Sequence, residues 1–114
     1  MKHVISLKNV KFATINNKFG VDKKGELYLT QEYRDFKNLI FLSAKRGYVR
    51  PPYKIKIISI MYQDYDNVLK PITDALKLAK IIKDDRFVLQ AEITKIPALR
   101  GQLGTLDVWI GTIE

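Results

Sequence analysis

Residues 54–90 read KIKIISIMYQDYDNVLKPITDALKLAKIIKDDRFVLQ and contain the clearest secondary-structure pattern of the chain. The first part, residues 54–62, begins with alternating lysine and isoleucine and then becomes mostly apolar, which predicts a strand well inside a sheet. Between Val68 and Ala79 the apolar residues recur every three or four positions, which predicts a helix with a broad buried stripe. Alternation returns at Phe87. A strand, a helix and a second strand in this order indicate an α/β or α+β domain with a mixed sheet.

The segments on either side extend this pattern into a complete domain. The other predicted elements are strands at residues 3–12, 26–29, 87–96 and 106–113, a helix at residues 31–45, and turn-rich loops at residues 14–20 and 22–25. Thr30 is a suitable N-cap for that helix, and Gly47 is expected to end it. Leu89 and Ala91 alternate with polar residues and predict an apolar face of their strand. We therefore expect one α+β domain over residues 1–114, with a single mixed sheet of about four to five strands and two helices.

Pro71 constrains where the helix between the two strands begins. Proline has no backbone N–H, and only the first four N–H groups of a helix lack an intrahelical partner. With Asn67 as N-cap, Pro71 is the fourth helical residue and removes no hydrogen bond, whereas with Asp66 as the cap it removes the first one. We therefore predict that Asn67 is the N-cap and that Asp66 lies just outside the helix.

The absence of cysteine and the presence of a single histidine, His3, exclude several classes of site. The chain forms no disulfide, no thiolate zinc site and no metal site built from several histidines. No apolar run approaches the roughly 18 residues that a membrane span needs. Polar residues interrupt the N-terminal segment from Lys8 onward, which does not match a signal peptide. These features favour a soluble protein of the cytoplasm.

The charge of the chain favours a polyanionic partner. The sequence contains 20 Lys and Arg against 12 Asp and Glu, which gives a formal net charge of +8. Such a surface attracts nucleic acid by neutralising phosphates and releasing counterions. The alternative is a basic protein whose charge serves only its solubility. A domain this small has limited stability of its own, so we expect a homodimer.

Aspartates are concentrated in one stretch of this basic chain. They are Asp64, Asp66, Asp74, Asp84 and Asp85. Clustered carboxylates repel one another unless a cation lies among them or one is protonated. Asp64 and Asp66 follow a strand two residues apart, so they point to the same side, beside a helix N-terminus that attracts anions. Asp85 begins the strand after that helix, and a strand-helix-strand path can return it beside them. Three carboxylates there would bind a divalent cation, best Mg²⁺.

This constellation allows a hydrolytic interpretation and a plainer one. A bound cation could activate a water and stabilise charge on a scissile phosphate. Lys70 follows Asp66 by four residues, close to one helical turn, and could reach a phosphate oxygen or the leaving group, or simply pair with Asp66. In the plainer interpretation Asp66 complements the helix N-terminus, the later Asp pair forms a surface turn, and Lys70 is an ordinary solvated lysine.

From Asp64 to Leu76 the chain reads DYDNVLKPITDAL, and from Asp84 to Val88 it reads DDRFV. These segments resemble the RusA family of Holliday junction resolvases, whose hallmark is D-x-D-N-x-x-K-x-x-x-D-x-L followed by an Asp pair and a strand. Looser similarity extends over most of the chain. The resemblance implies an Mg²⁺-dependent endodeoxyribonuclease, with Mn²⁺ as a substitute ion, that acts as a homodimer in DNA recombination and repair. Each subunit would nick one strand of a four-way junction at its own active site.

Carried over position by position, the resemblance assigns the residues of a catalytic site. Asp64, Asp66 and Asp85 would be the carboxylates that bind the metal ion and take part in catalysis. Lys70 would be the essential lysine of the family. Because members of the family are often carried by phages or prophages, the resemblance also makes such an origin plausible.

Three further motif residues would support the catalytic residues without binding the ion. We interpret Asn67 as the helix cap. We expect Asp74 to orient Lys70 or Lys77, and we expect Asp84 to lie beside the metal ligands. These assignments follow from the resemblance and from the position of each residue relative to the predicted helix.

The chain departs from the family pattern in two places. Lys80 stands where many members have a glycine before the Asp pair. Glycine suits a left-handed helix end, where lysine costs roughly 1 kcal/mol, so we expect the helix to run longer here. Met61, Tyr62 and Gln63 precede Asp64 where some members are arginine-rich, which bears on DNA contacts at this loop and not on the catalytic residues.

Residues outside the motif are candidates for binding DNA. The predicted contacts are Asn17, Lys18, Lys45, Arg46, Arg50 and Arg100. Tyr48 and Tyr53 lie close to some of these residues in the sequence, and would either stack on a distorted junction or belong to the core. Two alternatives to a junction resolvase stay open. One is a non-catalytic protein that binds branched DNA, and the other is a nuclease that prefers forks or flaps.

Overall fold

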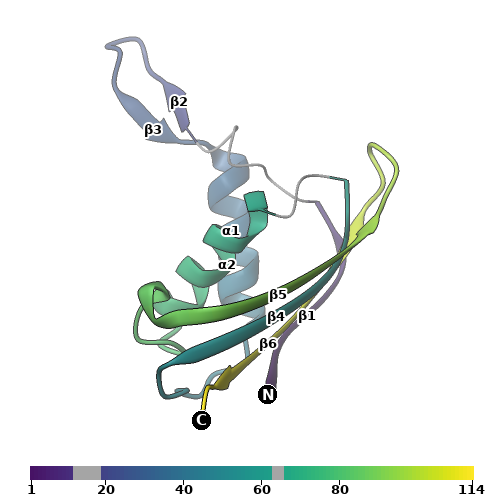
Figure 1. Ribbon diagram of the computed structural model, residues 1–114. Helices are drawn as coiled ribbons and strands as arrows, with labels where there is room; N and C mark the ends of the chain where they lie inside the picture. Colours follow the sequence, from purple (N-terminus) through teal and green to yellow (C-terminus); the bar gives the residue numbers. More distant parts are fainter. Residues whose placement is uncertain (12–18, 63–65) are drawn as a thin grey trace.

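The computed structural model describes residues 1–11, 19–62 and 66–114, except for the side chains of residues 19, 20, 28, 29, 66 and 67. In chain order its elements are β1 (Lys2–Val10), β2 (Phe19–Val21), β3 (Leu27–Leu29), α1 (Gln31–Ser43), β4 (Tyr53–Met61), α2 (Asp66–Leu78), the 3₁₀ helix η2 (Asp85–Phe87), β5 (Val88–Pro97) and β6 (Gly104–Thr112). Four strands form one mixed sheet in the order β1-β6-β4-β5, while β2 and β3 form a separate hairpin that projects from the body (Figure 1). The predicted α+β class with one mixed sheet and two α-helices is confirmed. None of the helices in the described residues is long and apolar enough to cross a membrane.

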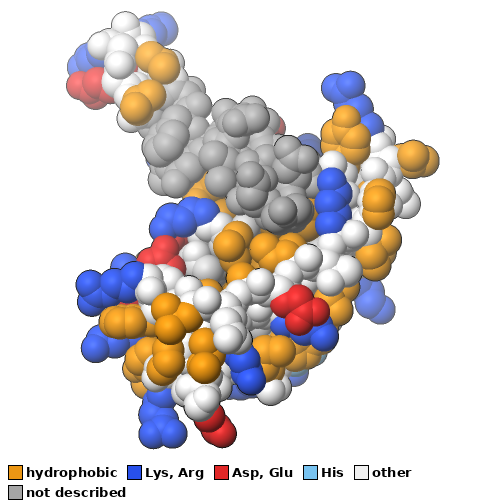
Figure 2. All heavy atoms as spheres, viewed as in Figure 1, with side chains coloured by type: hydrophobic (Ala, Val, Ile, Leu, Met, Phe, Trp, Pro, Cys, Tyr) orange, Lys and Arg blue, Asp and Glu red, His pale blue; other side chains and the backbone are white. Residues whose placement is uncertain are grey.

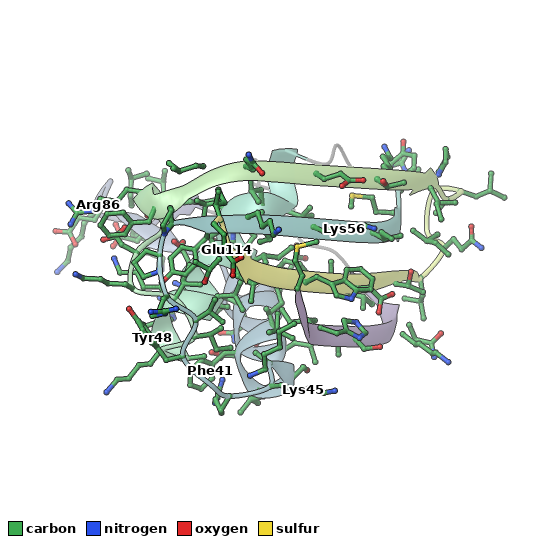
Figure 3. The ribbon with its side chains drawn as sticks, turned by 60° about the horizontal axis from the view of Figure 1, so that its bottom comes forward. Phe41, Lys45, Tyr48, Lys56, Arg86 and Glu114 are labelled. Carbon is green, nitrogen blue, oxygen red and sulfur yellow. The ribbon has the colours of Figure 1, made fainter. Side chains whose placement is uncertain are left out.

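β4 lies inside the sheet and supplies much of the core. It pairs in parallel with β5 and antiparallel with β6. Every second residue of β4 from Tyr53 to Met61 is buried, and both α-helices lie on one face of the sheet, behind it in Figure 3. Further core residues are Val68, Ile72, Ala75 and Leu76 of α2, Leu106, Val108 and Ile110 of β6, and Phe36 and Ile40 of α1. The alternation of Ile55 and Ile57 with lysines therefore matches the core-facing side of this strand, whereas Ile58 and Ile60 on the opposite face are only partly buried.

β5 is an edge strand, and its exposure differs from the prediction. Leu89 is 65% exposed and Ala91 is also exposed, so these two residues of the predicted apolar face are not buried, whereas Phe87 and Ile93 on the same predicted face are partly buried against the core. The core cluster is built on β4 and β6, and from β5 only Val88 and Ile93 pack against it, both partly buried. Alternation in the sequence does not distinguish an edge strand from an inner one, because both show the same period.

The projecting hairpin includes a strand that the sequence did not indicate. β2 pairs with β3, although residues 14–20 were predicted to be loop. The turn between β2 and β3 forms at residues 22–25, as predicted. Asp22 Oδ1 accepts hydrogen bonds from the backbone N–H groups of Lys24 at 2.8 Å and Glu26 at 2.9 Å. A carboxylate that bonds to the backbone just after it is a common way to stabilise a turn.

α1 begins where it was predicted to begin and ends earlier. Thr30 Oγ1 accepts a hydrogen bond from the Tyr33 N–H at 3.4 Å, which confirms the predicted N-cap. The helix ends before Lys45, so the predicted end at this residue and the predicted role of Gly47 are wrong. The reason is a tertiary contact, because the Lys45 N–H donates to the carbonyl of Val4 in β1 at 2.8 Å. The chain leaves the helix to join the sheet.

α2 begins at Asp66, so the prediction that Asn67 is the N-cap and that Asp66 lies outside the helix is wrong. Pro71 then lies in the second turn, where its missing N–H removes one backbone hydrogen bond. Packing compensates for this loss, since Val68 and Ile72 are fully buried. Burying one such side chain stabilises by about 1.5–3 kcal/mol, more than the roughly 0.5–1.5 kcal/mol of one hydrogen bond.

α2 ends in a left-handed turn at Lys80, whose φ is 57°. The Ile81 N–H donates to the carbonyl of Leu76 at 3.0 Å, and the Lys80 N–H donates to that of Lys77 at 3.0 Å. This is the Schellman arrangement, in which the left-handed residue is usually glycine. The expectation that the helix runs longer because Lys80 replaces glycine is therefore wrong. The helix stops at Leu78, and the lysine adopts the left-handed conformation.

Lys80→Gly is expected to stabilise the protein by roughly 1 kcal/mol, because glycine adopts this φ without steric conflict. For a domain of this size the melting temperature should rise by about 4 °C, which circular dichroism can measure. Lys37→Gly, in the middle of α1, is the control and should destabilise by about 1 kcal/mol. A melting temperature of Lys80→Gly at or below that of the wild type would contradict this interpretation of the turn.

Candidate active site

Charged side chains of the motif gather along one face of α2. Lys70, Asp74 and Lys77 are spaced by four and three residues, so they lie on one stripe of the helix. After the turn that ends α2, the chain returns beside this stripe. Asp84 Oδ2 lies 3.6 Å from Lys77 Nζ, and Asp85 Oδ2 lies 2.7 Å from Lys70 Nζ. Two segments that are separate in the sequence thus form one charged cluster.

Lys70 joins two carboxylates. In addition to its contact with Asp85, its Nζ lies 3.1 Å from Asp74 Oδ1, one helical turn away. The Lys70 side chain is 50% exposed, whereas those of Asp85 and Asp74 are 32% and 22% exposed. The ammonium group is therefore accessible to a ligand while the carboxylates hold it from the protein side. Of the predicted site residues, these three are brought together by direct contacts.

The two carboxylates keep Lys70 positively charged. The hydrogen bond to Asp85, and after it the one to Asp74, raise the pKa of Lys70 above its ordinary value of 10.5, and they outweigh the partial desolvation that lowers it. A lysine with a raised pKa is a poor general base near neutral pH. Its chemistry is that of a fixed cation, which can stabilise negative charge on a neighbouring phosphate.

Asp84 shapes the turn that presents Asp85. Asp84 Oδ1 accepts a hydrogen bond from the Arg86 N–H at 3.2 Å and caps η2. This hydrogen bond is the main reason that the pKa of Asp84 lies below its ordinary value. Its other oxygen faces Lys77 at 3.6 Å and Arg86 at 4.0 Å. Asp84 therefore fixes the backbone next to Asp85, and none of these contacts is to Lys70.

The other predicted ligands lie outside the described side chains. Asp64 is outside the described residues altogether, and Asp66 and Asn67 are described by their backbone alone. Asp66 precedes Lys70 by four residues in α2, which places it about 6 Å earlier along the helix axis. Among the side chains that the structure describes, no three acidic or histidine groups gather around one point. In the described part of the site, the Lys70 ammonium group lies between the carboxylates of Asp74 and Asp85. Of these two, Asp85 is the predicted Mg²⁺ ligand, and carboxylate oxygens suit Mg²⁺.

The two segments of the motif, residues 64–76 and 84–88, are brought together by the path of α2 and not by neighbouring strand ends. In the parallel register of β4 and β5, Val88 lies opposite Tyr53. Asp85 therefore lies near the start of β4, whereas Asp64 follows the end of β4 in the sequence. Between them α2 runs back along the sheet, and its second turn carries Lys70 to Asp85.

The residues predicted to bind DNA that the structure describes lie at two separate places. Lys45, Arg46 and Arg50 lie on the connector between α1 and β4, whereas Arg100 lies in the loop between β5 and β6, at the opposite end of the sheet (Figure 1). The Arg46 guanidinium donates to the Phe41 carbonyl at 2.9 Å and lies 4.4 Å from the centre of the Phe41 ring. This guanidinium is thus engaged within the protein. Two further predicted contacts, Asn17 and Lys18, lie outside the described residues.

A basic surface beside the charged cluster was not among the predictions. It consists of Lys80, Lys83 and Arg86, which we call the basic turn, and all three are exposed, Arg86 by 72%. Lys83 Nζ and the Arg86 guanidinium lie 5.8 Å and 4.9 Å from the centre of the Phe87 ring. Figure 2 shows lysine and arginine side chains gathered around the end of α2 and η2. The sequence contained a signal for this surface, since a basic residue stands at every third position from Lys77 to Arg86.

No protein-family model and no curated protein with which the sequence was compared matches it. The functional interpretation therefore depends on the motif and on the contacts around Lys70.

Proposed function

We propose that the protein is a metal-dependent endodeoxyribonuclease that cuts branched DNA, with the four-way junction as its substrate, as the RusA-like motif implies. The contact of Lys70 with both Asp74 and Asp85 carries this proposal. Lys70 and Asp85 are 15 residues apart in the sequence, yet the fold joins them at a partly exposed position. Groups whose pKa values are strongly shifted by specific charged partners are concentrated at functional sites.

Each motif residue has a defined part in this proposal. As the motif implies, Asp64, Asp66 and Asp85 would hold Mg²⁺, or Mn²⁺ in its place, through carboxylate oxygens. Of these three, Asp85 is the one whose side-chain contacts the structure describes. When bound, the ion would supply an activated water and stabilise charge on the scissile phosphate. Lys70 offers a permanent positive charge to a phosphate oxygen or to the leaving group. Asp74 orients Lys70 through their contact of 3.1 Å.

The charge of the surface supports a DNA substrate. The chain carries a net charge of +8, and the basic turn directly adjoins η2, which carries Asp85. We assign the basic turn to phosphates on either side of the scissile bond, where it would contribute affinity without reading base sequence. A homodimer would present two such sites across a junction and nick two strands. The proposed setting is recombination and repair of DNA in the cytoplasm, in a phage, a prophage or their host.

Nicking of synthetic branched DNA tests the proposal directly. The protein is incubated with a labelled four-way junction, a fork, a flap and a linear duplex, each in Mg²⁺, in Mn²⁺ and in EDTA. We expect paired nicks in the junction with either metal, none in EDTA, and slow cleavage of the duplex. Cleavage of forks or flaps faster than of the junction would support a nuclease with a different preferred substrate. Junction binding without product in either metal would instead identify a non-catalytic protein that binds branched DNA.

Lys83→Ala and Arg86→Ala are expected to weaken junction binding to a similar degree for all DNA sequences. Each should lower the slope of log affinity against log salt by about one, because each removes one phosphate contact. Fluorescence anisotropy in EDTA at several salt concentrations measures this slope. Arg46→Ala is the matched control, since the Arg46 guanidinium donates a hydrogen bond to the Phe41 carbonyl at 2.9 Å, and it should leave the slope unchanged. If Arg46→Ala alone lowered the slope, the DNA would bind at the connector between α1 and β4 and not at the basic turn.

A further inference from the structure

Tyr53 joins two loops beside the candidate active site. It is the first residue of β4, and its side chain is 0% exposed. Its hydroxyl donates a hydrogen bond to the carbonyl oxygen of Val49 at 2.8 Å and accepts one from the N–H of Lys83 at 2.9 Å. The N–H of Val49 donates to the carbonyl of Ile81 at 2.8 Å. These three hydrogen bonds tie the connector before β4 to the turn after α2.

The turn that Tyr53 holds leads directly into Asp84 and Asp85. The hydrogen bonds that end α2 extend as far as the Ile82 N–H, which lies 3.4 Å from the Leu76 carbonyl. The capping of η2 starts at Asp84. The hydrogen bond from Lys83 to Tyr53 falls between these two sets and fixes the backbone that links them.

A hydroxyl is well suited to this position. Buried backbone groups need hydrogen-bond partners, and a tyrosine hydroxyl can accept from an N–H and donate to a carbonyl at the same time. Burial is the main cause that raises the pKa of Tyr53 above its ordinary value of 10.0. The hydroxyl therefore keeps the proton that it donates to Val49 throughout the neutral range. Phenylalanine would fill the same space in the core and would join neither loop.

We propose that Tyr53 is a positioning residue of the nuclease site, because its hydroxyl fixes Lys83 and so holds Asp85 beside Lys70. Asp85 belongs to a 3₁₀ helix of only three residues, and such short helices have weak internal hydrogen bonds. The distance of 2.7 Å between Asp85 and Lys70 therefore depends on how the preceding turn is anchored. The effect on catalysis rests on the proposed function, whereas the anchoring of the turn does not.

Tyr53→Phe in the full-length chain tests this role, with Ser59→Ala as the matched control. Ser59 is also fully buried in β4, and its hydroxyl donates to the carbonyl of Thr105 at 2.6 Å, far from the turn. Backbone order parameters are measured by ¹⁵N relaxation in metal-free protein, at a temperature where circular dichroism shows both variants folded. In Tyr53→Phe, those of Asp85 and Arg86 should fall from about 0.85, the rigid value, toward 0.6. In Ser59→Ala they should not change.

The Mg²⁺ dependence of junction nicking provides the second measurement. In Tyr53→Phe the half-saturating Mg²⁺ concentration should rise roughly tenfold, as is typical when a group that orients a metal ligand is lost. The rate at saturating Mg²⁺ should change less, and junction binding in EDTA should not change. Unchanged order parameters, an equal effect of Ser59→Ala, or an unchanged Mg²⁺ requirement would each overturn the proposal. Lowered order parameters in a protein whose wild type does not nick DNA would support the anchoring by Tyr53 and overturn the nuclease assignment instead.

Discussion

Asp85→Asn is expected to lower the rate of Mg²⁺-dependent junction nicking by about a thousandfold while leaving junction binding in EDTA intact. Asparagine keeps the size of the side chain but removes the charge that pairs with Lys70 at 2.7 Å and that would bind a divalent cation in the proposed site. Removing a negative charge next to the basic turn does not weaken the attraction to phosphates, so binding should persist. Single-turnover nicking with protein in excess separates the chemical step from binding.

Asp107→Asn is the matched control for this substitution. The side chain of Asp107 is 33% exposed, compared with 32% for Asp85, and it also contacts a basic residue, His3, at 3.0 Å. Its neighbour Val108 is buried in the core, so Asp107 points to the opposite face of the sheet from the helices. Asp107→Asn should nick at the wild-type rate. If Asp85→Asn did so too, Asp85 would be a structural ion-pair partner and the nuclease site would not exist as proposed.

The fold could be predicted where the hydrophobic pattern is local. Residues 54–62 and 68–79 show the periods of a strand and a helix over enough positions to identify both, and their order then implies a mixed sheet. β2 was missed because Phe19-Gly20-Val21 follows a polar, turn-rich stretch and contains a glycine. β3 is equally short but has the sequence Leu-Tyr-Leu, without glycine, and was predicted as a strand. The ends of the helices were misplaced because contacts elsewhere in the fold decide them. Lys45 leaves α1 to bond with β1, and burial of α2 outweighs the hydrogen bond that Pro71 removes.

The members of the candidate site could be predicted from the motif, but their contacts could not. The sequence left Lys70 free to pair with Asp66 or to reach a phosphate. In the structure Lys70 contacts Asp74, as the position of Asp74 in the motif suggested, and also Asp85, which no helical spacing relates to it. Such a contact depends on the path of the turn after α2, and this path depends on tertiary hydrogen bonds.

Residues outside the motif were harder to interpret because their roles depend on what their side chains touch. Arg46 has the charge of a DNA-binding residue, but its guanidinium packs on Phe41. Tyr48 and Tyr53 were each open to two interpretations, base stacking and core packing, and the structure distinguishes the two residues. Tyr48 is 59% exposed, whereas Tyr53 is fully buried and cannot stack on a base. No sequence pattern indicates that the Tyr53 hydroxyl makes hydrogen bonds to two separate backbone segments.

Lys70→Met is expected to lower nicking by a factor of about 10²–10³, because in the proposed site it removes a fixed positive charge that would stabilise the transition state. Methionine is also unbranched and of similar reach, so the packing against α2 should be kept. The loss should appear mainly in kcat, since Lys70 would act on charge that develops during the reaction. Steady-state nicking over a range of junction concentrations separates kcat from KM.

The same substitution should have a pH-dependent effect on the stability of the metal-free protein. Asp85 and Asp74 raise the pKa of Lys70 above 10.5 in the folded state, so the folded protein holds this proton more tightly than the unfolded chain. The contribution of Lys70 to the free energy of unfolding is therefore fully present below about pH 10.4 and is lost as the pH rises through the raised pKa. The difference in unfolding free energy between wild type and Lys70→Met, from urea titrations in EDTA, should stay constant from neutral pH up to about pH 10.4 and then shrink.

Lys77→Met shows whether the position of Lys70 matters or only its charge. Lys77 lies on the same stripe of α2, is 51% exposed compared with 50% for Lys70, and also faces a carboxylate, that of Asp84 at 3.6 Å. An exposed lysine of this kind contributes little, so Lys77→Met should retain most of the wild-type kcat. Equal losses in the two variants would mean that any cation on this face of the helix serves the reaction, and would contradict a specific role for the contact between Lys70 and Asp85. A large loss in Lys70→Met alone requires that the ammonium group be held at one place, and in this fold the two carboxylates are what hold it there.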